Sequence, residues 1–286
     1  MTLLHVRDHG GDGPQLVLLH GYGRSLTDWD ASAALLTAGH RVLAVDLPGH
    51  GRSPGISSWT IPTVVRCIAD TLDARGVPEA VVVGHSLGGL VAVECARVKQ
   101  ERPRARAAVN LDGFWWGREY PGGARVSEGL LASAGIIAPP EYVEEQVVHS
   151  ARFGIPADRA EAAAREAARQ LPDGKWQTMP SRTEALEIVD ELHRLGALGV
   201  TTWLDGVDCP LLLVQAGRRL PPAPGMEWFD EFNGRFKRGV SDELAALSRT
   251  RPTVSVKQID ATHSMTLETP EAVATLVAAY VRGLPD

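Results

Sequence analysis

The sequence has few cysteines, no long apolar run and no excess of positive charge, and each absence excludes a class of protein. The three cysteines, Cys67, Cys95 and Cys209, are too widely spaced for a metal site or a disulfide framework. No segment approaches the roughly 18 consecutive apolar residues of a membrane-spanning helix. Lys and Arg total 29 against 35 Asp and Glu, so the net charge of −6 offers no basic surface for nucleic acid or an anionic membrane.

The first residues also lack the basic and apolar stretches of an export signal. We therefore expect a soluble, cytoplasmic protein whose partner is a small-molecule substrate, with neither nucleic acid nor membrane as a partner and no metal. The 286 residues are 44% hydrophobic and 22% charged, close to the average of soluble globular proteins, which is enough for a sizeable core. The oligomeric state stays open.

Strand-length apolar runs alternate with helix-length amphipathic segments up to about residue 113. This pattern is typical of an α/β fold with a mostly parallel central sheet and helices on both faces. The predicted strands in this part are Leu3–Asp8, Gln15–His20, Arg41–Asp46, Ala80–Gly84 and Arg106–Leu111. The predicted helices are Trp29–Leu36, Ile61–Arg75 and Leu87–Lys99. The pattern resumes with strands at Pro210–Gly217 and Thr253–Ile259, a helix around Ser241–Ser248 and a last helix opening at Thr269.

Residues 114–208 show a different pattern, with several helical stretches and no convincing strand. The predicted helices there are Glu141–Ala151, Ala157–Gln170 and Arg182–Leu195, of which the second is rich in alanine and charge. We therefore expect a core domain formed by residues 1–113 and 209–286, with residues 114–208 inserted as a helical cap.

The segment Gly84-His85-Ser86-Leu87-Gly88 joins a predicted strand directly to a predicted helix. A serine on so sharp a turn needs small residues two positions to either side, and the turn lifts its hydroxyl clear of the sheet. The start of the following helix offers free N–H groups where an oxyanion would form. Ser86 is therefore the candidate nucleophile.

Two further segments supply what a serine nucleophile requires. His20-Gly21-Tyr22-Gly23 follows a central strand, and its glycines let the amide of Tyr22 point to the same place as the amide of Leu87. These two donors form the predicted oxyanion hole. His263 follows the last strand, where an imidazole can take the proton of the serine hydroxyl.

These motifs, together with Asp46-Leu-Pro-Gly-His-Gly-Arg-Ser53 and Thr269-Pro-Glu, occur in an order that resembles a serine hydrolase of the α/β-hydrolase fold with a helical cap. They span nearly the whole chain outside the cap. The resemblance implies a triad of serine, acid and histidine, an acyl-enzyme intermediate and no cofactor.

The sequence departs from this family at the acid of the triad. Many relatives carry it in a Gly-x-x-Asp turn after the strand that follows the cap, but Gly217-Arg218-Arg219-Leu220 holds no carboxylate there. Other relatives place the acid directly before the cap, where this sequence has Asp112 followed by glycine. Asp112 is our predicted acid, because it can hold the imidazole in one tautomer. Glu227 and Asp230 are the alternatives.

The substrate pocket is assigned to His20, Gly21 and His85, which lie within the loop and elbow motifs, and to Trp115 and Trp116, which follow Asp112. Arg218 and Arg219 are expected at the sheet edge where ligands bind in such folds, either solvated or holding a substrate carboxylate.

The predicted activity is acyl transfer from an ester, thioester, lactone or activated amide with a largely apolar acyl or leaving group, as in carboxylic ester and thioester hydrolases. The alternative is a non-hydrolytic lyase or cyclase, or a ligand-binding member of the fold, that uses the capped pocket without an acyl-enzyme.

Overall fold

The computed structural model describes residues 1–98, 104–220 and 225–285. Its main sheet has seven strands in the order β1-β3-β2-β4-β5-β9-β10. Only β1 runs antiparallel to its neighbour, and the other pairs are parallel. The strands are β1 (Val6–Gly10), β2 (Gln15–Leu19), β3 (Arg41–Val45), β4 (Glu79–His85), β5 (Arg104–Leu111), β9 (Leu211–Ala216) and β10 (Val254–Ile259). The predicted α/β fold with a mostly parallel sheet is confirmed.

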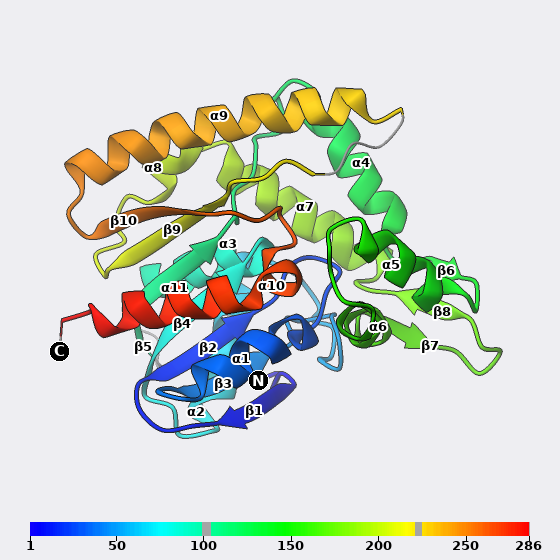
Figure 1. Ribbon diagram of the computed structural model, residues 1–286, viewed down its shortest axis with the longest axis horizontal. Helices are drawn as coiled ribbons and strands as arrows, with labels where there is room; N and C mark the ends of the chain where they lie inside the picture. The colour runs from blue at the N-terminus through cyan, green and yellow to red at the C-terminus, as the bar shows by residue number, and fades with distance from the viewer. Residues whose placement is uncertain (99–103, 221–224, 286) are drawn as a thin grey trace.

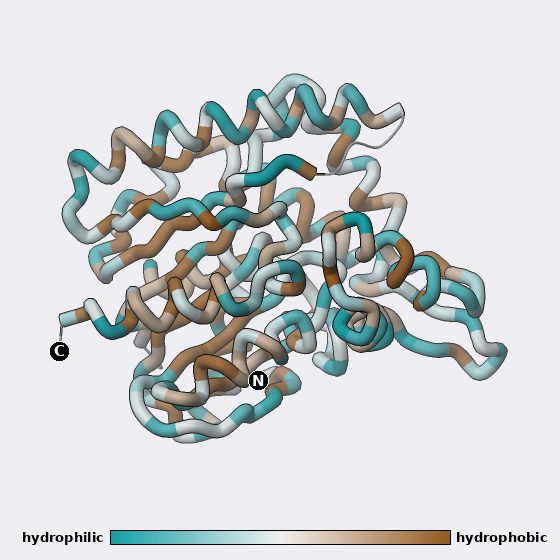
Figure 2. The backbone as a smooth tube through the Cα atoms, in the orientation of Figure 1, coloured by the Kyte–Doolittle hydropathy of each residue, from teal (hydrophilic) through white to brown (hydrophobic). Residues whose placement is uncertain are grey.

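Helices cover both faces of this sheet (Figure 1). Alternate residues of β2 belong to different cores, because side chains along a strand point to opposite faces: Leu16 and Leu18 to one, Val17 and Leu19 to the other. The first core is completed by α1 (Asp30–Leu36) and α11 (Pro270–Arg282), and the second by α2 (Ile61–Asp73) and α3 (Leu87–Arg97). The central strands β2 and β4 therefore contain continuous apolar runs, Leu16–Leu19 and Ala80–Val83 (Figure 2).

The segment between β5 and β9 contains helices, as expected, but also a small second sheet. Its helices are α4 (Gly123–Ser133), α5 (Tyr142–Ala151), α6 (Ala157–Glu166), α7 (Arg182–Gly196) and α8 (Gly199–Trp203). The strands β6 (Ile137–Ala138), β8 (Trp176–Thr178) and β7 (Ala168–Gln170) pair in that order. The expectation that this segment has no strand is therefore wrong.

The predicted helix Ala157–Gln170 ends four residues early, at Glu166. Residues 168–170 instead pair antiparallel with β8, and the side chain of Ala168 packs in a small buried cluster with Trp176. Tertiary pairing thus overrides the helix propensity of the alanine-rich sequence.

Helix α9 (Glu227–Thr250) is much longer than the predicted helix at Ser241–Ser248. Its many charged residues and two glycines make the helical pattern of apolar residues hard to recognise in the sequence. In the structure, Phe232, Val240, Leu244 and Leu247 form a buried stripe at helical spacing. The other boundaries shift less. The first strand starts at Val6 instead of Leu3, and Lys99, the predicted end of the third helix, lies outside the described residues.

Two short elements complete the described chain, namely the 3-10 helix η1 (Leu26–Trp29) and the helix α10 (Met265–Glu268). Among the residues that the structure describes, no helix combines the length and the apolar character needed to cross a membrane.

Candidate active site

Ser86 occupies a sharp turn between β4 and α3, as the sequence predicts. Its φ of 54° and ψ of −119° lie in a region that side chains other than glycine rarely adopt. The turn needs glycine nearby because a Cβ on Gly84 would lie 1.9 Å from the carbonyl oxygen of Gly88, and one on Gly88 would lie 2.3 Å from that of Leu19. The backbone itself therefore presents the hydroxyl of Ser86.

The side chains of Ser86, His263 and Asp112 form a continuous chain of contacts. Nε2 of His263 lies 3.1 Å from Oγ of Ser86, and Nδ1 of His263 lies 2.7 Å from Oδ2 of Asp112. The three residues follow β4, β10 and β5, whose carboxyl ends lie at one edge of the parallel sheet. The arrangement has the geometry of a nucleophile, a base and an orienting acid.

Asp112 is buried and held on both carboxylate oxygens. Its Oδ1 accepts a hydrogen bond of 3.0 Å from the amide of Ala216, and the ammonium of Lys237 lies 3.8 Å from Oδ2. Burial alone would raise the pKa of Asp112, but the hydrogen bond and charge of His263, the charge of Lys237 and the amide of Ala216 together lower it to about 2. The carboxylate is therefore ionised at neutral pH.

The alternative acids lie on α9 and, in the described structure, neither contacts His263. Glu227 accepts a hydrogen bond from the amide of Gly225, and Asp230 lines two cavities beside that of Ser86. Asp112 also shares with Ser86 a positive φ, and these are the only two such residues other than glycine among those described.

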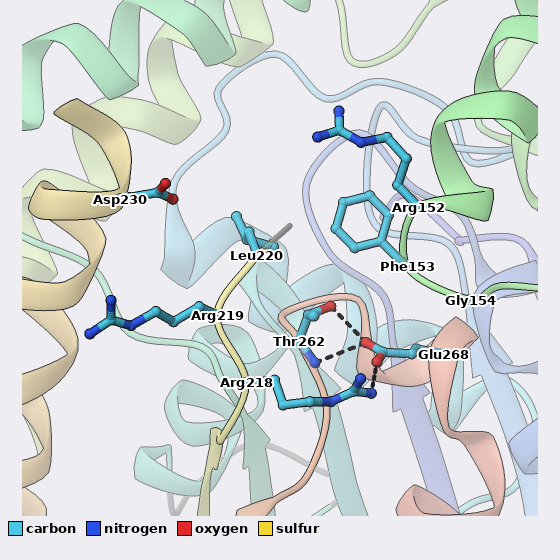
Figure 3. A pocket seen from close by; sticks show the side chains of 9 residues that line it. All are labelled: Arg152, Phe153, Gly154, Arg218, Arg219, Leu220, Asp230, Thr262 and Glu268. Atoms are coloured by element: carbon cyan, nitrogen blue, oxygen red, sulfur yellow. Dashed lines mark hydrogen bonds and ion pairs between the residues drawn. The ribbon is translucent and has the colours of Figure 1, made fainter. Parts of the chain in front are cut away.

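The loop that carries His263 is fixed from two sides. The side chain of Glu268 is only 3% exposed and accepts hydrogen bonds from the amide and the hydroxyl of Thr262. It also forms an ion pair with Arg218 (Figure 3). On the other side, Nε2–H of His85 donates to the carbonyl oxygen of His263 over 2.7 Å. These contacts set the position of the imidazole relative to Ser86.

The amides of Tyr22 and Leu87 lie at the sites the sequence suggests for an oxyanion hole. Leu87 is the first residue of α3, and Tyr22 follows directly on Gly21, where a Cβ would lie 3.2 Å from that of Ser86. Neither amide donates a hydrogen bond to any other described residue. Both are therefore available to an oxyanion bound at Ser86.

A cavity of about 330 Å³ opens above Ser86, and we call it the Ser86 cavity. Trp115 and Trp116 line it, with their rings stacked at 3.8 Å between centroids. Most of its other walls are apolar side chains from α4, α9 and the loop before α4. Its other lining residues are Tyr22, Asp112, Phe114, Val126, Leu130, Gln215, Leu220, Phe229, Phe232, Asn233, Phe236, Lys237, Val240, His263 and Ser264.

His20, Gly21 and His85 do not line this cavity, which corrects their assignment to the pocket. His20 is fully buried behind it, where Nδ1–H donates to the carbonyl of Gly21 and Nε2 accepts from the amide of Leu47. His85 points toward the His263 loop. Burial first, and then the charge of His263, lowers the pKa of His85 to about 4, so the ring is neutral at pH 7.

The sequence analysis missed the contribution of α9 to the Ser86 cavity. Phe229, Phe232, Phe236 and Val240 recur every three or four residues and so share one helix face, which is the signal that would have revealed it. No group of three or more His, Cys, Asp or Glu side chains suited to a metal ion occurs within the described ranges.

Comparison with known proteins identifies the family. The model of the "Alpha/beta hydrolase family" matches residues 16–276, and the chain therefore belongs to the α/β-hydrolase family and is a hydrolase. RutD of Variovorax paradoxus, named provisionally as a carbamate hydrolase, is 33% identical over 204 residues, which cover 70% of this chain and 75% of RutD.

Two further relatives match over almost the full length. A pimeloyl-[acyl-carrier protein] methyl ester esterase of Aromatoleum aromaticum is 29% identical over 286 residues, covering 94% of this chain and 99% of the esterase. The crystal structure of E-2-(acetamidomethylene)succinate hydrolase superposes with a TM-score of 0.75 at 22% identity, covering 98% of this chain and 95% of that one. The structural likeness supports the fold alone.

Proposed function

We propose that this protein is a serine hydrolase that cleaves an ester, thioester, lactone or activated amide by acyl transfer. The contacts from Ser86 through His263 to Asp112 beneath an apolar cavity carry this proposal. The similarity to esterases supports an ester or thioester as the reacting group.

In the proposed mechanism, Oγ of Ser86 attacks the substrate carbonyl while its proton passes to Nε2 of His263. The amides of Tyr22 and Leu87 stabilise the negative oxygen of the tetrahedral intermediate. The imidazolium returns the proton to the leaving group as the bond to it breaks, which leaves an acyl group on Ser86. Water, activated by the same imidazole, then releases the acid and restores the serine. Asp112 stays ionised throughout and stabilises the imidazolium.

We further propose that residues 114–208 act as a cap over a core of residues 1–113 and 209–286. Phe114, Trp115, Trp116 and Leu130 from this segment line the Ser86 cavity together with side chains of α9. These walls exclude water from the reacting atoms and favour a substrate with an apolar acyl or leaving group.

A lyase, a cyclase or a ligand-binding protein remained an alternative because the turn after β9 has no carboxylate. The contact between Asp112 and His263 supports the hydrolase instead, since it supplies the acid from the end of β5.

Intact-mass measurement after treatment with a fluorophosphonate probe tests the proposal. The wild type should gain one adduct, Ser86→Ala should gain none, and Ser264→Ala should gain one, because Ser264 lines the same cavity without contacting the imidazole ring through its hydroxyl. A folded wild type that gains no adduct, or a Ser86→Ala variant that keeps full turnover, would favour the alternative.

A further inference from the structure

A second cavity, of about 230 Å³, adjoins the Ser86 cavity, and we call it the basic cavity. Gln215, Asn233 and Lys237 line both cavities and so lie where the two cavities meet. The basic cavity differs sharply in chemistry, because its remaining charged lining consists of Arg218, Arg219 and Arg238 with one carboxylate, Asp230.

Of these cations, Arg218 is already neutralised. It pairs with the buried Glu268 and, over 3.4 Å, with the exposed Asp260. Figure 3 shows that the neighbouring side chain diverges from it: Arg218 turns to Glu268, whereas Arg219 extends toward α9. Neither Arg219 nor Arg238 forms a hydrogen bond or ion pair with another residue in the described part of the chain.

Lys237 connects this group of cations to the reacting centre. Its Nζ donates to the carbonyl oxygen of Ala216 over 3.2 Å and lies 3.8 Å from Oδ2 of Asp112. An ammonium has three donors, so Lys237 keeps donors for a ligand. Because Asp112 in turn contacts His263, only one side chain separates Lys237 from the catalytic imidazole.

We propose that the basic cavity binds a free carboxylate of the substrate, while an apolar spacer crosses the Ser86 cavity and the ester carbonyl lies at Ser86. This inference rests on the proposed function and narrows it to esters that carry a carboxylate. An apolar chain is stabilised by the aromatic walls, whereas a carboxylate is stabilised beside the exposed cations Arg219 and Arg238. The guanidinium of Arg219 offers two parallel N–H groups that match the two oxygens of a carboxylate.

The test compares kcat/KM for pairs of phenyl esters of equal chain length. One series comprises the monophenyl esters of straight dicarboxylic acids from succinic to suberic acid, and its neutral partners are the phenyl esters of the corresponding monocarboxylic acids. A third series carries the carboxylate on the alcohol side of the ester, and its neutral partners are the same esters without the carboxylate. We expect one charged series to exceed its neutral partner by about ten-fold or more at its best length. This ratio should decrease as salt is added.

Substitutions identify the side chains on which the preference for the charged ester depends. Arg219→Gln should lower the ratio of charged to neutral substrate several-fold, and Arg219→Glu should lower it further. Arg249→Gln is the matched control, because Arg249 is an exposed arginine in the last turn of α9 and lines neither cavity. It should leave the ratio unchanged.

The outcomes separate this inference from the proposed function. Neutral esters cleaved as fast as both charged series at every length would overturn the carboxylate site and leave the serine hydrolase intact. An equal loss of the ratio in Arg219→Gln and Arg249→Gln would also overturn it, since the effect would then be that of net charge. A wild type that cleaves no ester and gains no fluorophosphonate adduct would instead overturn the proposed function.

Discussion

Nδ1 of His263 lies 2.7 Å from Oδ2 of Asp112, although the two residues are 151 positions apart in the sequence. The two residues follow β10 and β5, and β9 lies between these strands in the sheet. The turn after β9 carries Leu220 at the position where many members of the family have the carboxylate of a Gly-x-x-Asp turn. In this chain the imidazole therefore reaches across β9 to the acid at the end of β5.

Asp112→Asn should reduce kcat for a phenyl ester by roughly a thousand-fold to ten-thousand-fold, because a neutral amide neither selects the tautomer of His263 nor stabilises the imidazolium. Steady-state kinetics measure the loss, and circular dichroism checks the fold. Asp230→Asn is the matched control and should stay within a few-fold of the wild type on a neutral phenyl ester, whose binding does not use the basic cavity that Asp230 lines. The assignment fails if Asp230→Asn or Glu227→Gln abolishes activity while Asp112→Asn retains it.

Glu268→Gln should lower kcat by roughly ten-fold with little change in KM, because the His263 loop loses the charge that holds Thr262 and Arg218. Removing the charge of the buried Glu268 carboxylate, which accepts these hydrogen bonds, should also lower the free energy of unfolding by about 1–3 kcal/mol. Glu271→Gln, the same change at an exposed site at the start of α11, is the control. Equal effects of the two substitutions on kcat would contradict the positioning role.

The free energy of unfolding should decrease as the pH falls from about 6.5 to about 4, in part because His85 must stay neutral in the folded protein. Burial and the charge of His263 lower its pKa from 6.5 to about 4, so in this window the unfolded state binds more protons than the folded state. Above about pH 6.5 the contribution of His85 to the free energy of unfolding is constant. His85→Gln should reduce the slope by up to one proton, about 1.4 kcal/mol per pH unit. Urea unfolding at several pH values measures it, and identical slopes would contradict the prediction.

Gly88→Ala should destabilise the protein by about 3 kcal/mol or more, since the new methyl group would meet the backbone oxygens of Leu19 and His20 beneath the Ser86 turn. Gly129→Ala is a matched substitution in the middle of α4, where nothing lies within 4 Å of the added carbon. It should instead stabilise by about 0.5–1 kcal/mol through helix propensity. Chemical denaturation measures the free energy of unfolding of both variants. A Gly88→Ala variant as stable as the wild type would contradict the close approach of Gly88 to the backbone of Leu19 and His20.

Much of the fold was predictable because its signals are local. The continuous apolar runs of β2 and β4 indicate strands covered on both faces, and glycines on either side of Ser86 indicate a tight turn. The small sheet β6-β8-β7 was not predictable in the same way. Its strands have two or three residues each and exist through pairing with one another, which a single stretch of sequence does not encode.

The functional site likewise contains residues that local sequence signals predict and residues that only tertiary packing brings together. His20 and His85 belong to the motifs around Tyr22 and Ser86, but their rings do not line the Ser86 cavity. Each ring instead forms hydrogen bonds with the backbone, His20 with Gly21 and Leu47 and His85 with His263. Conversely, Lys237 belongs to no motif that the sequence reveals, yet packing of α9 brings it to the cavity wall.

By itself the sequence determined the α/β fold, the turn that presents Ser86 and the histidine after the last strand, because each depends on residues close together in the chain. Only the tertiary structure decided that Asp112, rather than Glu227 or Asp230, contacts His263. The same holds for the basic cavity, where the loop after β9 meets α9. Such contacts depend on the order of strands in the sheet and on helix packing, which join residues that no local pattern relates.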